Sequence, residues 1–115
     1  MEIEIKGNNV ELKFDFRFIR KMDTLYRVEQ DGLGMSVGVA MAFNGLAMYS
    51  VTDLVNVIHG SIVDKVSRKD VEGAVEEYAE ENDGLEGLFI ELREELGKSP
   101  LTKATVQQFK KLAQA

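Results

Sequence analysis

His59 is the single histidine of this 115-residue chain, and histidine is the side chain that most often works as a catalytic base near neutral pH. Such a base needs a nucleophile and an orienting group within reach. Ser61 and Asp64 are close to it in the sequence, but no catalytic motif surrounds them. Because His59 falls beside Val55 and Ile58 on an expected helix, we interpret it as a packed side chain that makes one hydrogen bond.

A glycine-rich stretch at residues 32–38 is one residue away from a phosphate-binding fingerprint. Its sequence, GLGMSVG, differs from G-x-G-x-x-G because the third glycine falls one place late. The stretch is also expected to follow a helix, whereas the dinucleotide fingerprint follows a strand, and the chain has no Walker lysine motif. We therefore interpret it as a flexible connection and predict no bound cofactor.

Carboxylates are concentrated in residues 70–95, where a hydrolase or a metal site would have to be built. A hydrolase needs two carboxylates in one cleft with different environments, but these are spread along expected helices. The EENDG run at residues 80–84 lacks the alternating acids of a calcium loop. The chain has no cysteine, which excludes thiolate zinc sites and thiol nucleophiles. We predict a protein that is not an enzyme and that binds no metal.

Charge is unevenly distributed along the chain. Residues 1–69 are neutral overall, residues 70–95 carry eleven acids against Arg93 alone, and residues 96–115 carry four lysines and no acid. The acidic belt argues against a general nucleic-acid binder, which needs a basic face. A solvated helix face explains it most simply. In the functional alternative, the belt attracts a basic partner or keeps a protein with an adhesive surface soluble.

No membrane span or secretory signal is expected. The longest weakly polar stretch, residues 32–51, contains four glycines and an asparagine and is not apolar enough to cross a bilayer. The first residues are acidic and alternating, whereas a secretory signal begins with basic residues and an apolar run. We therefore expect a cytoplasmic location and no membrane partner.

Alternation of apolar and polar residues predicts an N-terminal β-hairpin over residues 1–16, with its turn at residues 7–9. One face would carry Ile3, Ile5, Val10, Leu12, Phe14 and Phe16. An isolated hairpin is barely stable in water, so this face must pack on helices or on another chain. Pairing of its edge with a second copy would give a homo-oligomer, which sedimentation over a range of concentrations tests.

Helical periodicity and capping signals predict about six short helices after the hairpin. The first begins near Phe18 and stops before Gly32, and the second, apolar nearly all round, spans residues 35–48. The next three begin at capping residues that each precede an acid by three positions. These capping residues are Ser50, Ser67 and Asp83.

Pro100 opens the last helix, since proline is tolerated at a first helical position. The fold class is therefore mainly α (α+β), with an N-terminal hairpin and about six helices in a single domain of residues 1–115. Residues 17–98 form the helical body and residues 99–115 the amphipathic C-terminal helix.

Apolar residues on two of these helices are the candidate binding surface. Met41 and Met48 are seven residues apart, hence on one helical face, and methionine adapts its shape to varied partners. Val106, Phe109 and Leu112 lie on the basic C-terminal helix. Core filling by the methionines, and packing of the last helix on the acidic belt, are the alternatives.

The two ends of the chain carry the patterns of a known family. The chain starts MEIEIKGN, continues with LKF at residues 12–14 and FRFIRKMD at residues 16–23, and has LGKSPLTK at residues 96–103. With its helical middle and acidic helix pair, it resembles the tail assembly chaperones of long-tailed bacteriophages, especially those of Gram-positive hosts. The likeness covers nearly the whole chain, although residues 32–49 match only in general character.

The resemblance implies a protein that acts in the host cytoplasm during virion assembly and is absent from the finished particle. Such proteins bind the long, helical tape measure protein, keep it soluble and help recruit tail tube subunits around it. Many also exist in a longer form made by programmed ribosomal frameshifting. The family has no catalytic motif. We hypothesise that Met41, Met48, Val106, Phe109 and Leu112 form the surface that binds the tape measure protein.

Two other functions stay open at this point. A virion structural or adaptor protein of the tail or the head–tail junction would be present in purified particles, where mass spectrometry finds it. A small regulator, such as an antitoxin or an inhibitor that mimics nucleic acid through its acidic belt, would bind a basic enzyme or repressor.

Overall fold

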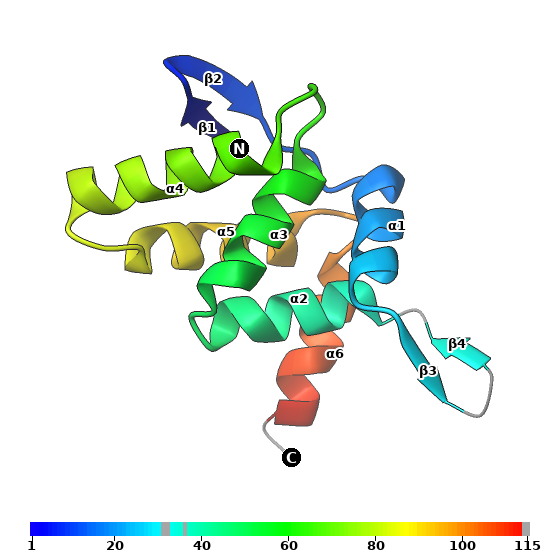
Figure 1. Ribbon diagram of the computed structural model, residues 1–115. Coiled ribbons are helices and arrows are strands. Elements are labelled where there is room, and N and C mark those ends of the chain that lie inside the picture. Colours follow the sequence, from blue (N-terminus) through cyan, green and yellow to red (C-terminus); the bar gives the residue numbers. More distant parts are fainter. Residues whose placement is uncertain (31–32, 36, 114–115) are drawn as a thin grey trace.

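The computed structural model describes residues 1–30, 33–35 and 37–113 (Figure 1). Within these residues the strands are β1 Glu2–Ile5, β2 Asn8–Glu11, β3 Val28–Gln30 and β4 Leu33–Met35. The helices are α1 Phe16–Leu25, α2 Gly38–Ala47, α3 Val51–Ser61, α4 Arg68–Asn82, α5 Glu86–Lys98 and α6 Lys103–Ala113. The predicted fold class, an N-terminal hairpin followed by helices, is confirmed. No described helix is long and apolar enough to cross a membrane.

The first hairpin, β1 with β2, turns through two residues. Lys6 and Gly7 both have positive φ angles, 52° and 78°, so Ile5 pairs with Asn8. Two positive φ angles are the signature of the tight hairpin turns whose twist matches the strands. The apolar face is buried as predicted at Ile3, Ile5, Val10 and Leu12, and β1 packs against α4.

The predicted continuation of this hairpin to residue 16 is wrong. The Asp15 side chain accepts a hydrogen bond from the Phe18 backbone N–H and caps α1, so Phe16 is already the first helical residue and is 60% exposed. Phe14 is half-buried and packs edge-on against Phe18, with ring centroids 5.1 Å apart. The capping bond therefore changes the backbone from strand to helix earlier than the alternation suggests.

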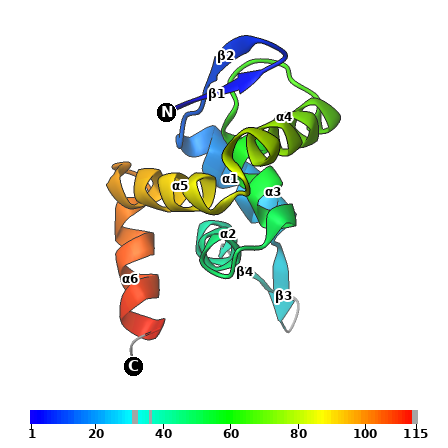
Figure 2. The ribbon, with the colours of Figure 1, turned by 90° about the vertical axis from the view of Figure 1, so that its left-hand side faces the viewer.

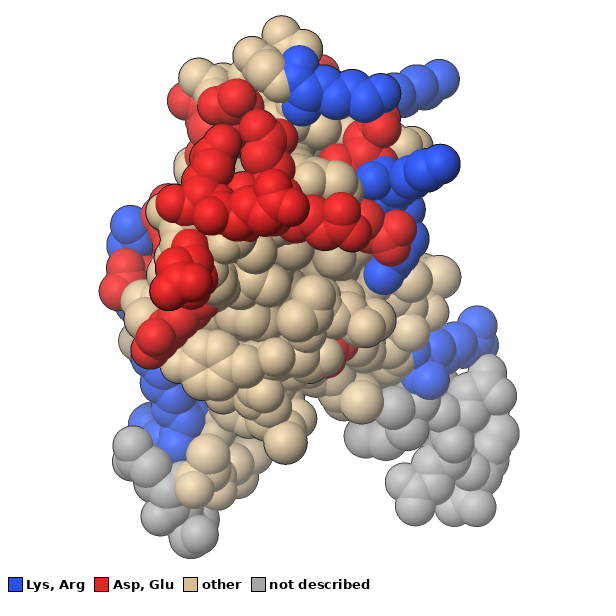
Figure 3. All heavy atoms as spheres, turned by 60° about the vertical axis from the view of Figure 1, so that its left-hand side comes forward, with Lys and Arg blue, Asp and Glu red and all other residues tan. Residues whose placement is uncertain are grey.

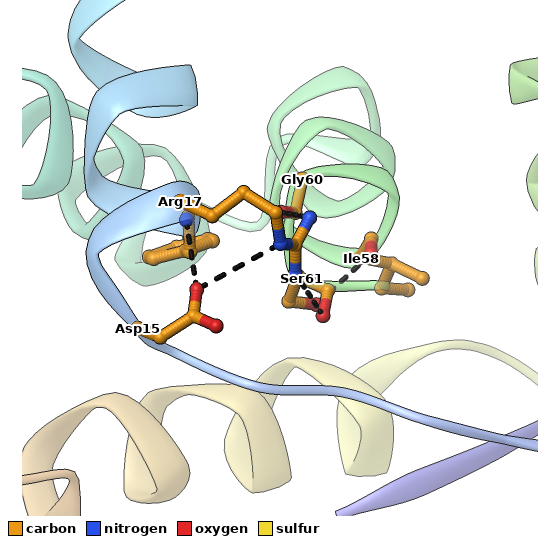
Figure 4. Close-up of polar contacts among 6 residues, drawn as sticks. Asp15, Arg17, Ile58, Gly60 and Ser61 are labelled. Atoms are coloured by element: carbon orange, nitrogen blue, oxygen red, sulfur yellow. Dashed lines mark hydrogen bonds and ion pairs between the residues drawn. The ribbon is translucent and has the colours of Figure 1, made fainter. Parts of the chain in front are cut away.

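The C-terminal end of α3 ties the hairpin to the helical body. The Lys13 N–H donates to the Ser61 carbonyl at 2.8 Å, and Leu12 forms a bridge with Ile62. The Arg17 guanidinium donates to the carbonyls of Gly60 and Ser61 at 3.3 and 3.2 Å (Figure 4). The last carbonyls of a helix have no partner within the helix and form its negative end, so a cation from α1 stabilises α3 there.

A second hairpin, β3 with β4, stands where two helices were predicted to meet. Helix α1 ends at Leu25 and α2 begins at Gly38, and Val28 pairs with Met35 between them. The predictions that the first helix continues to Gly32 and that the second begins at residue 35 are therefore wrong. The GLGMSVG stretch is not one flexible connection, because Gly34 lies in β4 and Gly38 begins α2. Residues 32 and 36 of that stretch lie outside the described residues.

Helix α2 is the centre of the fold and packs against α1, α3, α5 and α6. Figure 2 looks along α2 and shows the other helices arranged around it. A Cβ atom on Gly38 would lie 2.2 Å from the Met22 carbonyl carbon, and one on Gly45 would lie 2.2 Å from Oδ2 of Asp53. Gly38 lets the backbone of α2 approach that of α1, and Gly45 leaves room for the Asp53 side chain where α2 turns into α3. The Asp23 side chain accepts a hydrogen bond from the Gly38 N–H and supplies the missing cap of α2.

Replacing Gly38 with alanine is expected to lower the free energy of unfolding by about 3 kcal/mol, because the new Cβ would force apart two backbones rather than a movable side chain. Gly73→Ala in α4 is the matched control. Nothing lies within 4 Å of its Cβ position, so the free energy of unfolding should rise by about 0.5–1 kcal/mol. Urea unfolding measures both, and equal effects of the two changes would contradict the close contact of α1 with α2.

Candidate partner-binding surface

The five residues proposed as the partner surface differ widely in exposure. Val106 is 1% exposed and belongs to the core, whereas Leu112 and Met48 are 66% and 72% exposed. Phe109 is half-buried, with its ring 5.4 Å from that of Phe43. Met41 is exposed on α2. In this structure Val106 therefore anchors α6, and the accessible members of the set are Met41, Met48, Leu112 and part of Phe109.

A hydrogen-bonded turn after α5 sets the direction of α6. The prediction that Pro100 opens the last helix is wrong, because α6 begins at Lys103. The buried Thr102 hydroxyl donates to the Leu96 carbonyl at 2.6 Å, and the Ser99 hydroxyl donates to the Glu95 carbonyl at 2.8 Å. The Thr102 carbonyl then accepts from the Val106 N–H. As a result α6 packs on α5 and α2 near its beginning and extends away from the body at its end (Figures 1 and 2).

This arrangement opens a groove of about 690 Å³ between α5 and α6, which we call the α5–α6 groove. Its apolar part combines two residues of α2 with residues of the two walls. The lining residues are Phe43, Ala47, Ile90, Arg93, Glu94, Gly97, Lys98, Phe109, Lys110 and Ala113. A smaller hollow of about 360 Å³, which includes Ala40 and Leu112, lies beside α6.

Ile90 is the most exposed large apolar residue among the groove residues that the sequence reasoning missed. It is 39% exposed and lies on α5, whose buried stripe consists of Leu88, Phe89, Leu92 and Leu96. An isoleucine outside that stripe, on a helix otherwise covered with acids, was the signal available in the sequence. Together with Phe43 and Phe109 it gives the groove apolar residues from all three helices.

Apolar surface continues beyond the groove along α5. A second hollow, of about 590 Å³, includes Tyr49, Val51 and Phe89. Tyr49 packs edge-on against Phe89, with centroids 5.2 Å apart, and the Arg93 guanidinium lies over the Tyr49 ring at 5.2 Å. A cation over an aromatic face is attracted by the ring quadrupole, so Arg93 is held at the junction of the groove and this hollow.

The acidic belt does not cover the apolar surface. Figure 3 shows acidic side chains in a band above a broad area of uncharged side chains. The groove itself has a carboxylate on the α5 wall, Glu94, and an ammonium on the α6 wall, Lys110. No ion pair joins these two among the described residues, whereas Lys98 pairs with Glu95 at 3.0 Å. The Glu95 carboxylate beside Lys98 raises the pKa of that amine above its usual value.

The residues that suggested catalysis make separate structural contacts. His59 Nε2 lies 3.0 Å from the Val66 carbonyl, and the Ser61 hydroxyl donates to the Ile58 carbonyl at 2.9 Å. Burial, followed by the charges of Lys21 and Arg68, lowers the pKa of His59. No three His, Asp or Glu side chains in residues 1–30, 33–35 and 37–113 are grouped to hold a metal ion.

Tyr26 is a titratable group whose pKa is shifted strongly. It donates to the Asp53 carboxylate and accepts a hydrogen bond from Asn56 at 2.9 Å. Burial and the bond to Asp53 raise the pKa of Tyr26 to about 12, so the phenol stays protonated at neutral pH. This contact joins the end of α1 to the start of α3.

The comparison with protein families gives one match that covers nearly the whole chain. The model of the family described as "Phage tail assembly chaperone protein, TAC" matches residues 2–111, from β1 through most of α6. Comparisons with curated proteins and with solved structures give no match.

Removal of the Phe109 ring should loosen α6 without unfolding the body. Phe109→Ala is expected to lower the free energy of unfolding by about 2 kcal/mol and to speed amide exchange across α6, because the ring is half-buried against Phe43. Leu112→Ala, at an exposed position of the same helix, should change stability by less than about 0.5 kcal/mol. Equal destabilisation by both variants, in urea unfolding with amide exchange, would argue against this docking of α6.

Proposed function

The chain belongs to the phage tail assembly chaperone family, and from this we propose that it binds the phage tape measure protein, keeps it soluble and promotes assembly of the tail tube around it. Chaperones of this kind are not catalysts, and they act in the host cell rather than as parts of the particle. The host cytoplasm is the location that this proposal assigns.

The observation that carries the proposal is the α5–α6 groove, with exposed Ile90 on one wall, half-buried Phe109 on the other and Phe43 from α2 between them. One common mode of recognition lays the apolar face of an amphipathic helix into such a groove. Helix α5 has 13 residues and is about 20 Å long, which matches three to four turns of a partner helix. A tape measure protein, being long and helical, offers such stripes before the tail tube encloses it.

The rest of the surface suits a temporary partner. A few apolar anchors surrounded by charged residues give moderate affinity, because most of the binding energy of an interface comes from a few buried residues. The belt of residues 70–95 has a net charge of −10, which keeps a chain with exposed apolar side chains soluble. The groove would therefore bind the tape measure protein while the belt prevents aggregation.

A charge inside the groove should abolish this binding. Ile90→Asp is expected to weaken co-purification with the co-expressed tape measure protein by about tenfold or more, because the new carboxylate would be desolvated against the apolar stripe of the partner. Ile90 is partly exposed, so the far-ultraviolet circular dichroism of the free variant should not change.

Phe16→Asp is the matched control for this test. Phe16 is also an exposed apolar residue, but it lies on the first turn of α1, where a carboxylate is tolerated, and it lines neither hollow beside α6. It should retain full binding. If Ile90→Asp binds as well as the unchanged chain, the groove is not the binding site.

The temporary role is tested in the particle itself. Mass spectrometry should detect this chain bound to the tape measure protein in infected cells but not in purified virions. Stoichiometric presence in virions would instead support the adaptor function.

A further inference from the structure

A separate hollow, of about 460 Å³, lies on other elements, where α1 and the α3–α4 loop meet the end of α3. We call it the basic hollow, because three cationic side chains line it against one carboxylate. Its lining residues are Arg17, Lys21, His59, Ile62, Val63, Asp64, Lys65, Val66 and Ser67. The proposed groove shares none of these residues.

The cations of this hollow outnumber its acids. Lys21 and Lys65 line it, and Arg68 is close enough for its charge to act on His59. None of these three forms an ion pair with a residue in the described part of the chain. Like charges gathered without counter-charges raise the free energy of the folded chain, and a bound anionic group would lower it. In a chain with a net charge of −6, such a cluster is a local exception.

Three further features shape the hollow. Arg17 is held in place by its bonds to the Gly60 and Ser61 carbonyls, with Asp15 at 3.9 Å, so it forms a fixed positive wall (Figure 4). The His59 Nε2 atom must carry its proton, because the Val66 carbonyl beside it can only accept a hydrogen bond. Val63 is exposed and offers an apolar contact among the charges.

We propose that the basic hollow binds an acidic segment of a partner protein, with carboxylates on Lys21 and Lys65 and an apolar side chain on Val63. The mixture of separated cations and an exposed valine fits a peptide better than a bare phosphate. A long polyanion such as nucleic acid is disfavoured, because the belt of net charge −10 on the same small molecule repels it. The hollow would thus engage a different segment from the one in the α5–α6 groove.

The single histidine makes the test direct. Nuclear magnetic resonance of the full-length chain, titrated with an octaglutamate peptide, should shift the His59 ring signals and raise the His59 pKa, because carboxylates nearby stabilise the imidazolium. The double variant Lys21→Glu with Lys65→Glu should bind the peptide at least about tenfold more weakly. The double variant Lys103→Glu with Lys111→Glu, which makes the same charge change on α6, should bind within about twofold of the unchanged chain.

A gain of binding provides a check that misfolding cannot imitate. Asp64→Asn removes the one carboxylate that lines the hollow and should tighten peptide binding by about threefold or more. Each of three results would overturn the proposal: no shift of His59 with the peptide, equal weakening by the two double variants, or inorganic phosphate or an eight-residue oligothymidylate binding at least as tightly as the peptide. A fourth result would also contradict it. If the peptide shifts the His59 signals only under conditions where sedimentation finds a monomer, the hollow binds a second copy of this chain instead.

Discussion

The close burial of α2 is the constraint on which the rest of the structure depends. Four helices pack around this ten-residue helix, and they can do so because Gly38, Ala42 and Gly45 carry little or no side chain where neighbours approach. The same packing leaves one stripe of α2 uncovered, at Met41 and Met48. It also places Phe43 and Ala47 between α5 and α6, so the floor of the groove is part of the core. The proposed binding surface and the stability of the fold therefore both depend on the packing of α2.

Local signals in the sequence predicted most of the helices. Ser50 and Ser67 cap α3 and α4 by accepting from Asp53 N and Asp70 N, as the spacing of each serine and acid indicated. The same prediction for Asp83 is wrong, because Asp83 ends α4 in the left-handed conformation and α5 begins after Leu85. The first hairpin followed from alternation and its glycine turn. The second hairpin was missed because each strand has three residues, too few for alternation to show. The Asp-Gly pair at residues 31–32 is a common hairpin-turn dipeptide and was the available signal.

The candidate site was predictable only in part, for a physical reason. Helical spacing placed Val106, Phe109 and Leu112 on one helix, but it could not show that Val106 faces the core while Leu112 faces solvent. That division depends on how α6 leaves α5, which the buried Thr102 hydroxyl determines through its bond to the Leu96 carbonyl. Ile90 became part of the surface only when α6 was placed opposite it. The sequence contains more apolar helix residues than the site uses, and the contacts between helices decide which of them line it.

Charge segregation gives the faces of this small chain different properties. Acids gather on α4 and α5, and cations gather between α1 and the α3–α4 loop. The α5–α6 groove carries one carboxylate, Glu94, beside the cations Arg93, Lys98 and Lys110. We propose that this groove holds a helix of the tape measure protein. Hydrogen exchange of the chain, free and bound to that protein, tests it most directly. Slower exchange in residues 90–98 and 105–113 upon binding is predicted, with α1 unchanged. Slower exchange confined to the N-terminal hairpin or α1, with α5 and α6 unaffected, would contradict it.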